Sequence, residues 1–192
     1  ELLRDKFGPD GLNCLLNNAV TITDLDFGTP LDGAAAATII HTGAAPTVNG
    51  IAAGTFYDKD NRRSFSSFLS DPTDDIPANY SPARIISTTI ADELRIDGGG
   101  MCEVHSIAPD AALAIAGAGH SASSAHWFSD TDGKWVTSKA YPDSSPLIQN
   151  YNRTHSVATV LDTLGWSPSI SVNDYPDIPS FRRAYPFSIR FG

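Results

Sequence analysis

Apolar residues recur at helical spacing in two early stretches of the chain. The first, 12–18, places three leucines after Pro9-Asp10-Gly11 and ends at two asparagines, which predicts a short helix. In the second, Asp32 precedes Gly33 and a run of four alanines. Asp is a good N-cap and alanine the strongest helix former, so we expect a helix over Gly33–Thr42 that ends at Gly43.

Further helices are predicted later in the chain. A serine followed by proline favours a helix start, and a glycine run favours a stop. One helix is expected to start at Ser81-Pro82 and to end at the glycines 98–100; its apolar face would consist of Ile85, Ile86, Thr89, Ile90 and Leu94. Three more are expected, over 109–116, from 144–146 onwards, and over 157–164.

Alternating apolar and polar positions predict strands. Val20–Thr23 is one such stretch, and 102–108 reads as a buried strand. Two hairpins are expected where strand-like residues flank a polar turn. They are 55–57 with 64–66 around 58–61, and 126–128 with 134–137 around 130–133. In the early part of the chain the predicted strands alternate with helices, and predicted hairpins follow later. The predicted class is therefore α/β with an inserted antiparallel part.

Composition narrows the possible partners. The 192 residues are 41% hydrophobic and 18% charged, which is typical of a globular protein, and their formal net charge is -9. A surface of that sign repels phosphate backbones, so nucleic acid is not an expected partner. No run of 18 apolar residues is present, so no membrane span is expected. The chain starts at Glu1 without a signal peptide, which suggests processing or trimming.

Several motifs have a structural and a chemical interpretation. Cys14 and Cys102 allow one disulfide or two buried free thiols. The turns at 58–61 and 130–133 resemble the start of calcium loops, but no glutamate occupies the twelfth position, so plain turns are favoured. Gly119–Ser123 lacks the last glycine of a nucleophile elbow and is interpreted as a structural turn. The five histidines show no zinc-binding spacing.

An ordered set of strings resembles the alkaline phosphatase superfamily, in the branch of secreted bacterial phosphatases related to nucleotide pyrophosphatases and phosphodiesterases. The main string is Thr42-Gly43-x-x-Pro46-x-Val48-Asn49-Gly50-Ile51. Others follow in the branch's order and cover most of residues 3–175: Lys6–Gly8, Leu15–Asn17, Phe56–Asp58, Ser81-Pro82, Ser87–Leu94, Ala118–Ala122, Trp127-Phe128 and Trp135–Ser138. The resemblance implies an N-terminal, partial three-layer α/β/α core with inserted hairpins.

The departures from that family concern its chemistry. The family's threonine nucleophile falls on Gly33, its following histidine on Ala37, and the two basic residues of its phosphoryl clamp on Asp110 and Ala112. A register shifted by one residue would offer Asp32 as the nucleophile but breaks the match at Pro30. The family's two zinc ions are not expected on this chain alone, because most of their ligands belong to segments outside it. Asp110 and His120 remain candidate binding residues.

These observations favour a non-catalytic, alkaline-phosphatase-like binding or scaffold element. We expect a single domain over 1–192, with 52–80 and 124–192 as hairpin or cap insertions, completed by another protein chain or by the remainder of a longer polypeptide. One alternative is a fragment or subunit of a metal-dependent phosphatase or phosphodiesterase completed by another chain. Another is a glycan- or lipid-binding aromatic surface made of Trp127, Trp135 and Trp166. The resemblance implies a periplasmic or extracellular location.

Overall fold

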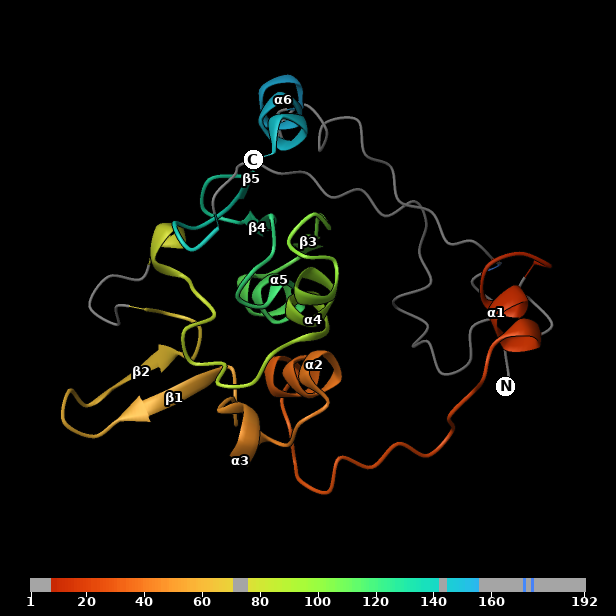
Figure 1. The fold of residues 1–192 in the computed structure, drawn as a ribbon, viewed down its shortest axis with the longest axis horizontal. Coiled ribbons are helices and arrows are strands. Elements are labelled where there is room, and N and C mark those ends of the chain that lie inside the picture. Colours follow the sequence, from red (N-terminus) through yellow and green to blue (C-terminus); the bar gives the residue numbers. More distant parts are fainter. Residues whose placement is uncertain (1–7, 71–75, 142–144, 156–170, 172–173, 175–192) are drawn as a thin grey trace. The chain divides into compact units, whose positions relative to one another are not determined.

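The computed structural model describes residues 8–70, 76–141, 145–155, 171 and 174 (Figure 1). The chain divides into two compact units, one of Glu1–Asp26 with Ala158–Gly192 and one of Phe27–Val157. The expectation of a single domain over 1–192 stays a prediction. The predicted helix over 157–164, and Trp166, lie outside the described residues.

The smaller unit contains helix α1, Leu12–Asn18, as the leucine spacing predicts. The predicted strand over Val20–Thr23 is wrong, because this stretch is irregular and Val20 is 93% exposed. Alternation shows which side chains would share a face, but a strand also needs a neighbour to pair with.

Helix α2, Gly33–Thr42, has the bounds expected from its sequence. Asp32 caps its first turn, and Gly43 ends it with a φ of 64°. Helix α3, Pro46–Asn49, follows and is ended by Gly50 with a φ of 87°. A Cβ at Gly50 would lie 2.5 Å from the carbonyl oxygen of Arg84, so glycine is required there by space as well as by conformation.

The string shared with the phosphatase family, 42–51, thus has a structural explanation. Asn49 is completely buried, and its side chain donates to the Ala44 carbonyl at 2.8 Å and accepts from the Ile51 N–H at 2.8 Å. Ile51 then enters the main hydrophobic core. These residues stabilise a turn that joins α2 to the core.

The first predicted hairpin is confirmed. Strands β1, Thr55–Asp58, and β2, Arg63–Ser66, pair antiparallel. Asp58 accepts from the backbone N–H groups of Asp60 and Asn61 within the turn, so this motif serves a hairpin. A 3₁₀ helix, η2, spans Pro77–Asn79.

The helix expected from Ser81-Pro82 begins later. Helix α4 spans Ile90–Asp97, and Thr89 and Asp92 form a capping box at its start. Before it the chain is irregular: Ile85 is buried, whereas Ile86 is 72% exposed and its N–H donates to the Asn49 carbonyl. The helix ends at the glycine run as predicted.

The larger sheet contains the parallel connection of the fold. Strand β3, His105–Ala108, pairs parallel with β4, Ser124–Ser129, and helix α5, Ala111–Ala118, connects them. Strand β5, Lys134–Val136, pairs antiparallel with β4 and confirms the second hairpin, so the order is β3-β4-β5. The strand predicted within 102–108 is confirmed over 105–108, but it is only partly covered, with Ile107 57% exposed, so the prediction that it is buried is wrong.

The core lies between this sheet and its helices. Helix α5 contacts β3 and β4 on one side and α2 on the other (Figure 1). The buried cluster joins Ala114, Ile115 and Ala118 of α5 with residues from β4 and the connecting segments: Ile51, Phe68, Ile85, Ala122, Ala125, Trp127 and Tyr141. The architecture is α/β, as predicted.

Helix α6, Pro146–Thr154, is present where Ser145-Pro146 predicted it and contacts β5. Cys14 and Cys102 are both exposed, so the prediction of buried thiols is wrong. Within the described part of the chain, every helix is too short or too polar to cross a lipid bilayer.

Candidate functional site

The start of helix α2 is where the family resemblance locates a nucleophile. Gly33 is the first residue of the helix and brings no side chain. A Cβ at this position would meet no atom within 4 Å, so packing does not require glycine there. The backbone could therefore carry a larger residue.

Asp32, the alternative nucleophile, has both carboxylate oxygens engaged by backbone donors. Oδ1 accepts from the Ala35 N–H at 2.9 Å, and Oδ2 accepts from the Gly54 N–H at 2.6 Å. These bonds cap α2 and tie it to the segment that leads into β1. Such bonds draw electron density from a carboxylate and fix its direction, which suits a cap better than a nucleophile.

The two positions that align with the family's phosphoryl clamp also have structural roles. Asp110 is the N-cap of α5, and its Oδ1 accepts from the Leu113 N–H at 3.0 Å. Ala112 packs against the hydrophobic core. A carboxylate and a methyl group supply none of the donors that grip phosphoryl oxygens.

His120 lies in a hydrogen-bonded network, and its side chain is 41% exposed. Its Nδ1 lies 3.1 Å from Asp92 Oδ2, and its Nε2 lies 2.8 Å from the carbonyl oxygen of Ile85. Both partners are acceptors, so both bonds form together only when each ring nitrogen carries a hydrogen. His120 is the one sequence-predicted binding residue that the structure brings against another ionisable side chain.

Asp92 is the centre of this network and was missed as a functional candidate from the sequence. It is 3% exposed, and it accepts from the Thr89, His120 and Ser121 backbone N–H groups at 2.9, 2.8 and 2.9 Å. Burial acts to raise the pKa of Asp92, but the hydrogen bonds from Thr89, His120 and Ser121 outweigh it and lower the pKa well below its usual range. The spacing Thr89-x-x-Asp92 is the sequence signal that could have found it.

The near match to a nucleophile elbow belongs to the same network. The Ser121 hydroxyl donates to Asp92 Oδ1 at 2.8 Å, so this hydroxyl is bonded to a carboxylate that is itself fixed by five other groups. Gly119, the first residue of this segment, has a φ of 63°. The segment is a structural turn, as the sequence favours.

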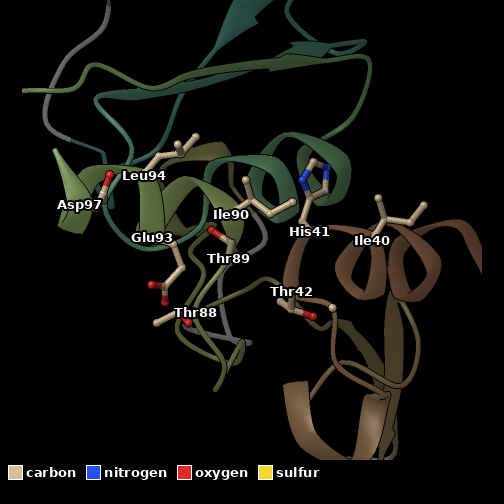
Figure 2. A pocket seen from close by; sticks show the side chains of 10 residues that line it. Ile40, His41, Thr42, Thr88, Thr89, Ile90, Glu93, Leu94 and Asp97 are labelled. Carbon is tan, nitrogen blue, oxygen red and sulfur yellow. The ribbon is translucent and has the colours of Figure 1, made fainter. Parts of the chain in front are cut away.

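A groove of about 420 Å³ lies between the C-terminal turn of α2 and helix α4 (Figure 2). Ile40, Ile90 and Leu94 line it, and each is more than half exposed. Glu93 and Asp97 of α4 add two carboxylates. The groove is at the opposite end of α2 from Gly33 and combines apolar side chains with negative charge.

Comparisons with known proteins match this chain to part of larger enzymes. It is 29% identical over 179 residues to alkaline phosphatase PafA of Elizabethkingia meningoseptica, covering 90% of the chain and 33% of that protein. It is 23% identical to alkaline phosphatase PhoV of Synechococcus elongatus and 26% to a calcium-transporting ATPase of Myroides odoratus, covering 34% and 32% of them. A crystal structure of wild-type PafA aligns with a TM-score of 0.72 at 27% identity, over 91% of this chain and 35% of that one.

The chain is alkaline-phosphatase-like. No family model matches it. It spans about a third of the length of the curated relatives above, which fits the N-terminal portion expected from its sequence.

The described residues of this chain do not fit the two-zinc centre that the family resemblance implies. Across 8–70, 76–141 and 145–155, no group of three His, Cys, Asp or Glu side chains could hold a metal ion. Asp32 has its oxygens engaged by N–H donors, which compete with a cation for the same lone pairs. We therefore derive no chemical step through a metal in this chain.

The alternative of an aromatic surface made of Trp127, Trp135 and Trp166 is not supported at Trp127 and Trp135, and Trp166 lies outside the described residues. Trp127 is 4% exposed, because β4 directs it into the core, where its ring lies 5.7 Å from that of Tyr80. Trp135 is half-buried and packs edge-on against Phe128. A planar ligand could not stack on Trp127.

Proposed function

We propose that this chain is a non-catalytic alkaline-phosphatase-like element that serves binding or scaffolding. The observation that carries the proposal is the start of α2, where Gly33 offers no nucleophile and both oxygens of Asp32 are bonded to backbone N–H groups. Asp110 and Ala112 at the clamp positions support it, because a phosphate would meet a negative charge there.

The test is an assay of the full chain with p-nitrophenyl phosphate in the presence of Zn²⁺. Alkaline phosphatase PafA, assayed in parallel, is the positive control. We expect product to form no faster than in buffer with Zn²⁺ alone, and intact-mass spectrometry to find no phosphorylated residue. Turnover above that background, or a phosphoryl group on Asp32, would refute the proposal.

The binding part of the proposal rests on the groove between α2 and α4. Exposed apolar side chains gathered in one groove are typical of a contact surface. Ile40, Ile90 and Leu94 would bind the environment-sensitive dye ANS, and replacing Ile40 and Leu94 by serine should reduce that fluorescence at least about twofold. Equal fluorescence from the two proteins would show that the groove is not such a surface.

A second candidate function follows from the length comparison. The chain matches only about a third of its alkaline phosphatase relatives, so it could be one part of a metal-dependent phosphatase or phosphodiesterase that another chain or segment completes. Zinc-dependent hydrolysis of an aryl phosphate by a verified complete assembly supports this candidate, and an inactive complete assembly removes it. The kinship also supports a periplasmic or extracellular location, which fractionation of the source cells would test.

A further inference from the structure

A second cavity lies away from both the start of α2 and the groove beside α4. It has a volume of about 420 Å³ and is bounded by the turn 76–78, strands β4 and β5 with Thr137, and helix α6. Cavities of 300–1,000 Å³ are typical of small-molecule sites. Its size therefore admits an organic ligand as well as water.

His126 lines this cavity with hydrogen-bonding capacity that the described residues leave unused. Its side chain is almost fully buried, with 1% exposure, and within the described part of the chain the Val136 backbone is at most the one hydrogen-bond partner of its two ring nitrogens. Burial lowers the pKa of His126, which favours the neutral ring, although the Val136 backbone opposes the shift. A neutral imidazole offers one donor and one acceptor, and the Val136 backbone could engage only one of them.

Thr137 adds a second unsatisfied polar group to the same cavity. Its Oγ1 atom is buried and has no hydrogen-bond partner among the described residues. Leaving a buried polar atom without a partner costs free energy, so native proteins rarely retain several such atoms in one place without something that satisfies them. The pair points to an occupant with its own donor and acceptor.

The walls of the cavity define the rest of that occupant. Ile76, Pro77, Trp135 and Ile148 contribute apolar surface. Asn152 of α6 holds one wall in place, because its side chain accepts from the Trp135 N–H at 3.0 Å and donates to the Trp135 carbonyl at 2.7 Å. Asp132 and Gln149 also line the cavity, and a largely apolar wall that includes the Trp135 ring suits a molecule with a flat apolar body and a single polar end.

We propose that this cavity binds a small uncharged molecule with a flat apolar body and a hydroxyl or amide group that hydrogen-bonds to His126 and Thr137. The site is separate from the phosphatase-like positions and gives the chain a ligand of its own. Ordered water alone is the competing occupant, since water satisfies buried polar atoms in many proteins.

The test is a titration of the full chain with 2-naphthol, followed by ligand-observed NMR, with naphthalene as the matched probe that lacks the hydroxyl. We expect saturable binding of 2-naphthol and at least about tenfold weaker binding of naphthalene, because naphthalene leaves the polar atoms unpaired. Absence of saturable 2-naphthol binding would overturn the proposal, as would equal affinity for the two probes.

Variants separate a ligand site from a packing defect. His126→Phe should weaken 2-naphthol binding by about tenfold, and Thr137→Val, which changes shape least, should weaken it severalfold. His105→Phe on the neighbouring strand is the matched control and should leave binding unchanged. If His126→Phe fails to fold, Thr137→Val decides the outcome. Unchanged affinity in Thr137→Val, or a crystal structure soaked in 2-naphthol that shows only water on His126, would refute the site.

Discussion

Asp92 accepts a hydrogen bond from the Ser121 hydroxyl at 2.8 Å and so joins the start of helix α4 to the turn that follows α5. The same carboxylate accepts from the N–H groups of His120 and Ser121. One side chain thus fixes two segments that are 28 residues apart in the sequence.

Replacing Asp92 by alanine should lower the free energy of unfolding by at least about 3 kcal/mol, because several buried donors lose their acceptor at once. For a chain of this size that corresponds to a fall of about 10 °C in the melting temperature. Thermal denaturation followed by circular dichroism measures the effect. Asp97→Ala, an exposed change on the same helix, should shift the melting temperature by less than about 2 °C, and similar shifts in both variants would contradict the network.

Gly119→Ala should destabilise the chain far more than Gly99→Ala. Both glycines have φ near +60°, but a Cβ at Gly119 would collide with Thr89 Oγ1 and lie 2.6 Å from Asp92 Oδ2, whereas a Cβ at Gly99 meets nothing within 4 Å. We expect a loss of about 1 kcal/mol at Gly99 from backbone strain alone, and at least twice that at Gly119. Urea denaturation of the two variants gives the comparison, and equal losses would show that crowding has no part.

Substitutions at the two ends of α2 should have opposite signs. Gly33 has open space and a φ outside the left-handed region, so Gly33→Ala should stabilise the chain by a few tenths to about 1 kcal/mol. Gly43 also has open space but a φ of 64°, so Gly43→Ala should destabilise it by about 1 kcal/mol. Denaturant midpoints measure both, and a loss of stability in Gly33→Ala would mean that glycine is structurally required there.

Gly33→Thr restores a hydroxyl at the nucleophile position and should fold normally without gaining hydrolysis of p-nitrophenyl phosphate. The reason is that Asp110 and Ala112 still supply no clamp and the described residues contain no metal site. The assay with Zn²⁺ described above is the measurement. Activity above the level of the unmodified chain would show that the side chain at residue 33 was the only missing part.

Stability should fall as the pH drops below about 6.5, the ordinary pKa of histidine, because the buried His126 ring resists protonation in the folded state while the unfolded chain takes up the proton. Nearby His105 strengthens this effect, because a positive charge on His105 disfavours a positive charge on His126. Urea midpoints at pH 7 and pH 5 should differ more in the unmodified chain than in His126→Phe. An identical pH dependence in both would assign it to other groups.

Sequence reasoning succeeded where the signals were local. The bounds of α2 follow from Asp32, the alanine run and Gly43, all within a dozen residues, and both hairpins follow from polar turns between strand-like residues. The start of α4 was misplaced because Ile85 and Ile86 also fit a helical spacing. Ile86 instead donates to the Asn49 carbonyl, a contact that the local pattern does not contain.

The candidate site was less predictable because its main features are tertiary. The resemblance aligns Asp110 and Ala112 with the family's clamp positions, but it does not indicate that one caps a helix and the other packs on the core. The role of Asp92 and the position of His126 beside a cavity depend on segments that are far apart in the sequence. No spacing rule connects Thr137 with η2 or α6.

The open space beside Gly33 has an evolutionary consequence. Because a Cβ there meets no neighbour within 4 Å, the scaffold could have lost its side chain at this position without any rearrangement of the backbone. The geometry at the head of α2 can therefore be inherited intact while the chemistry of residue 33 is exchanged.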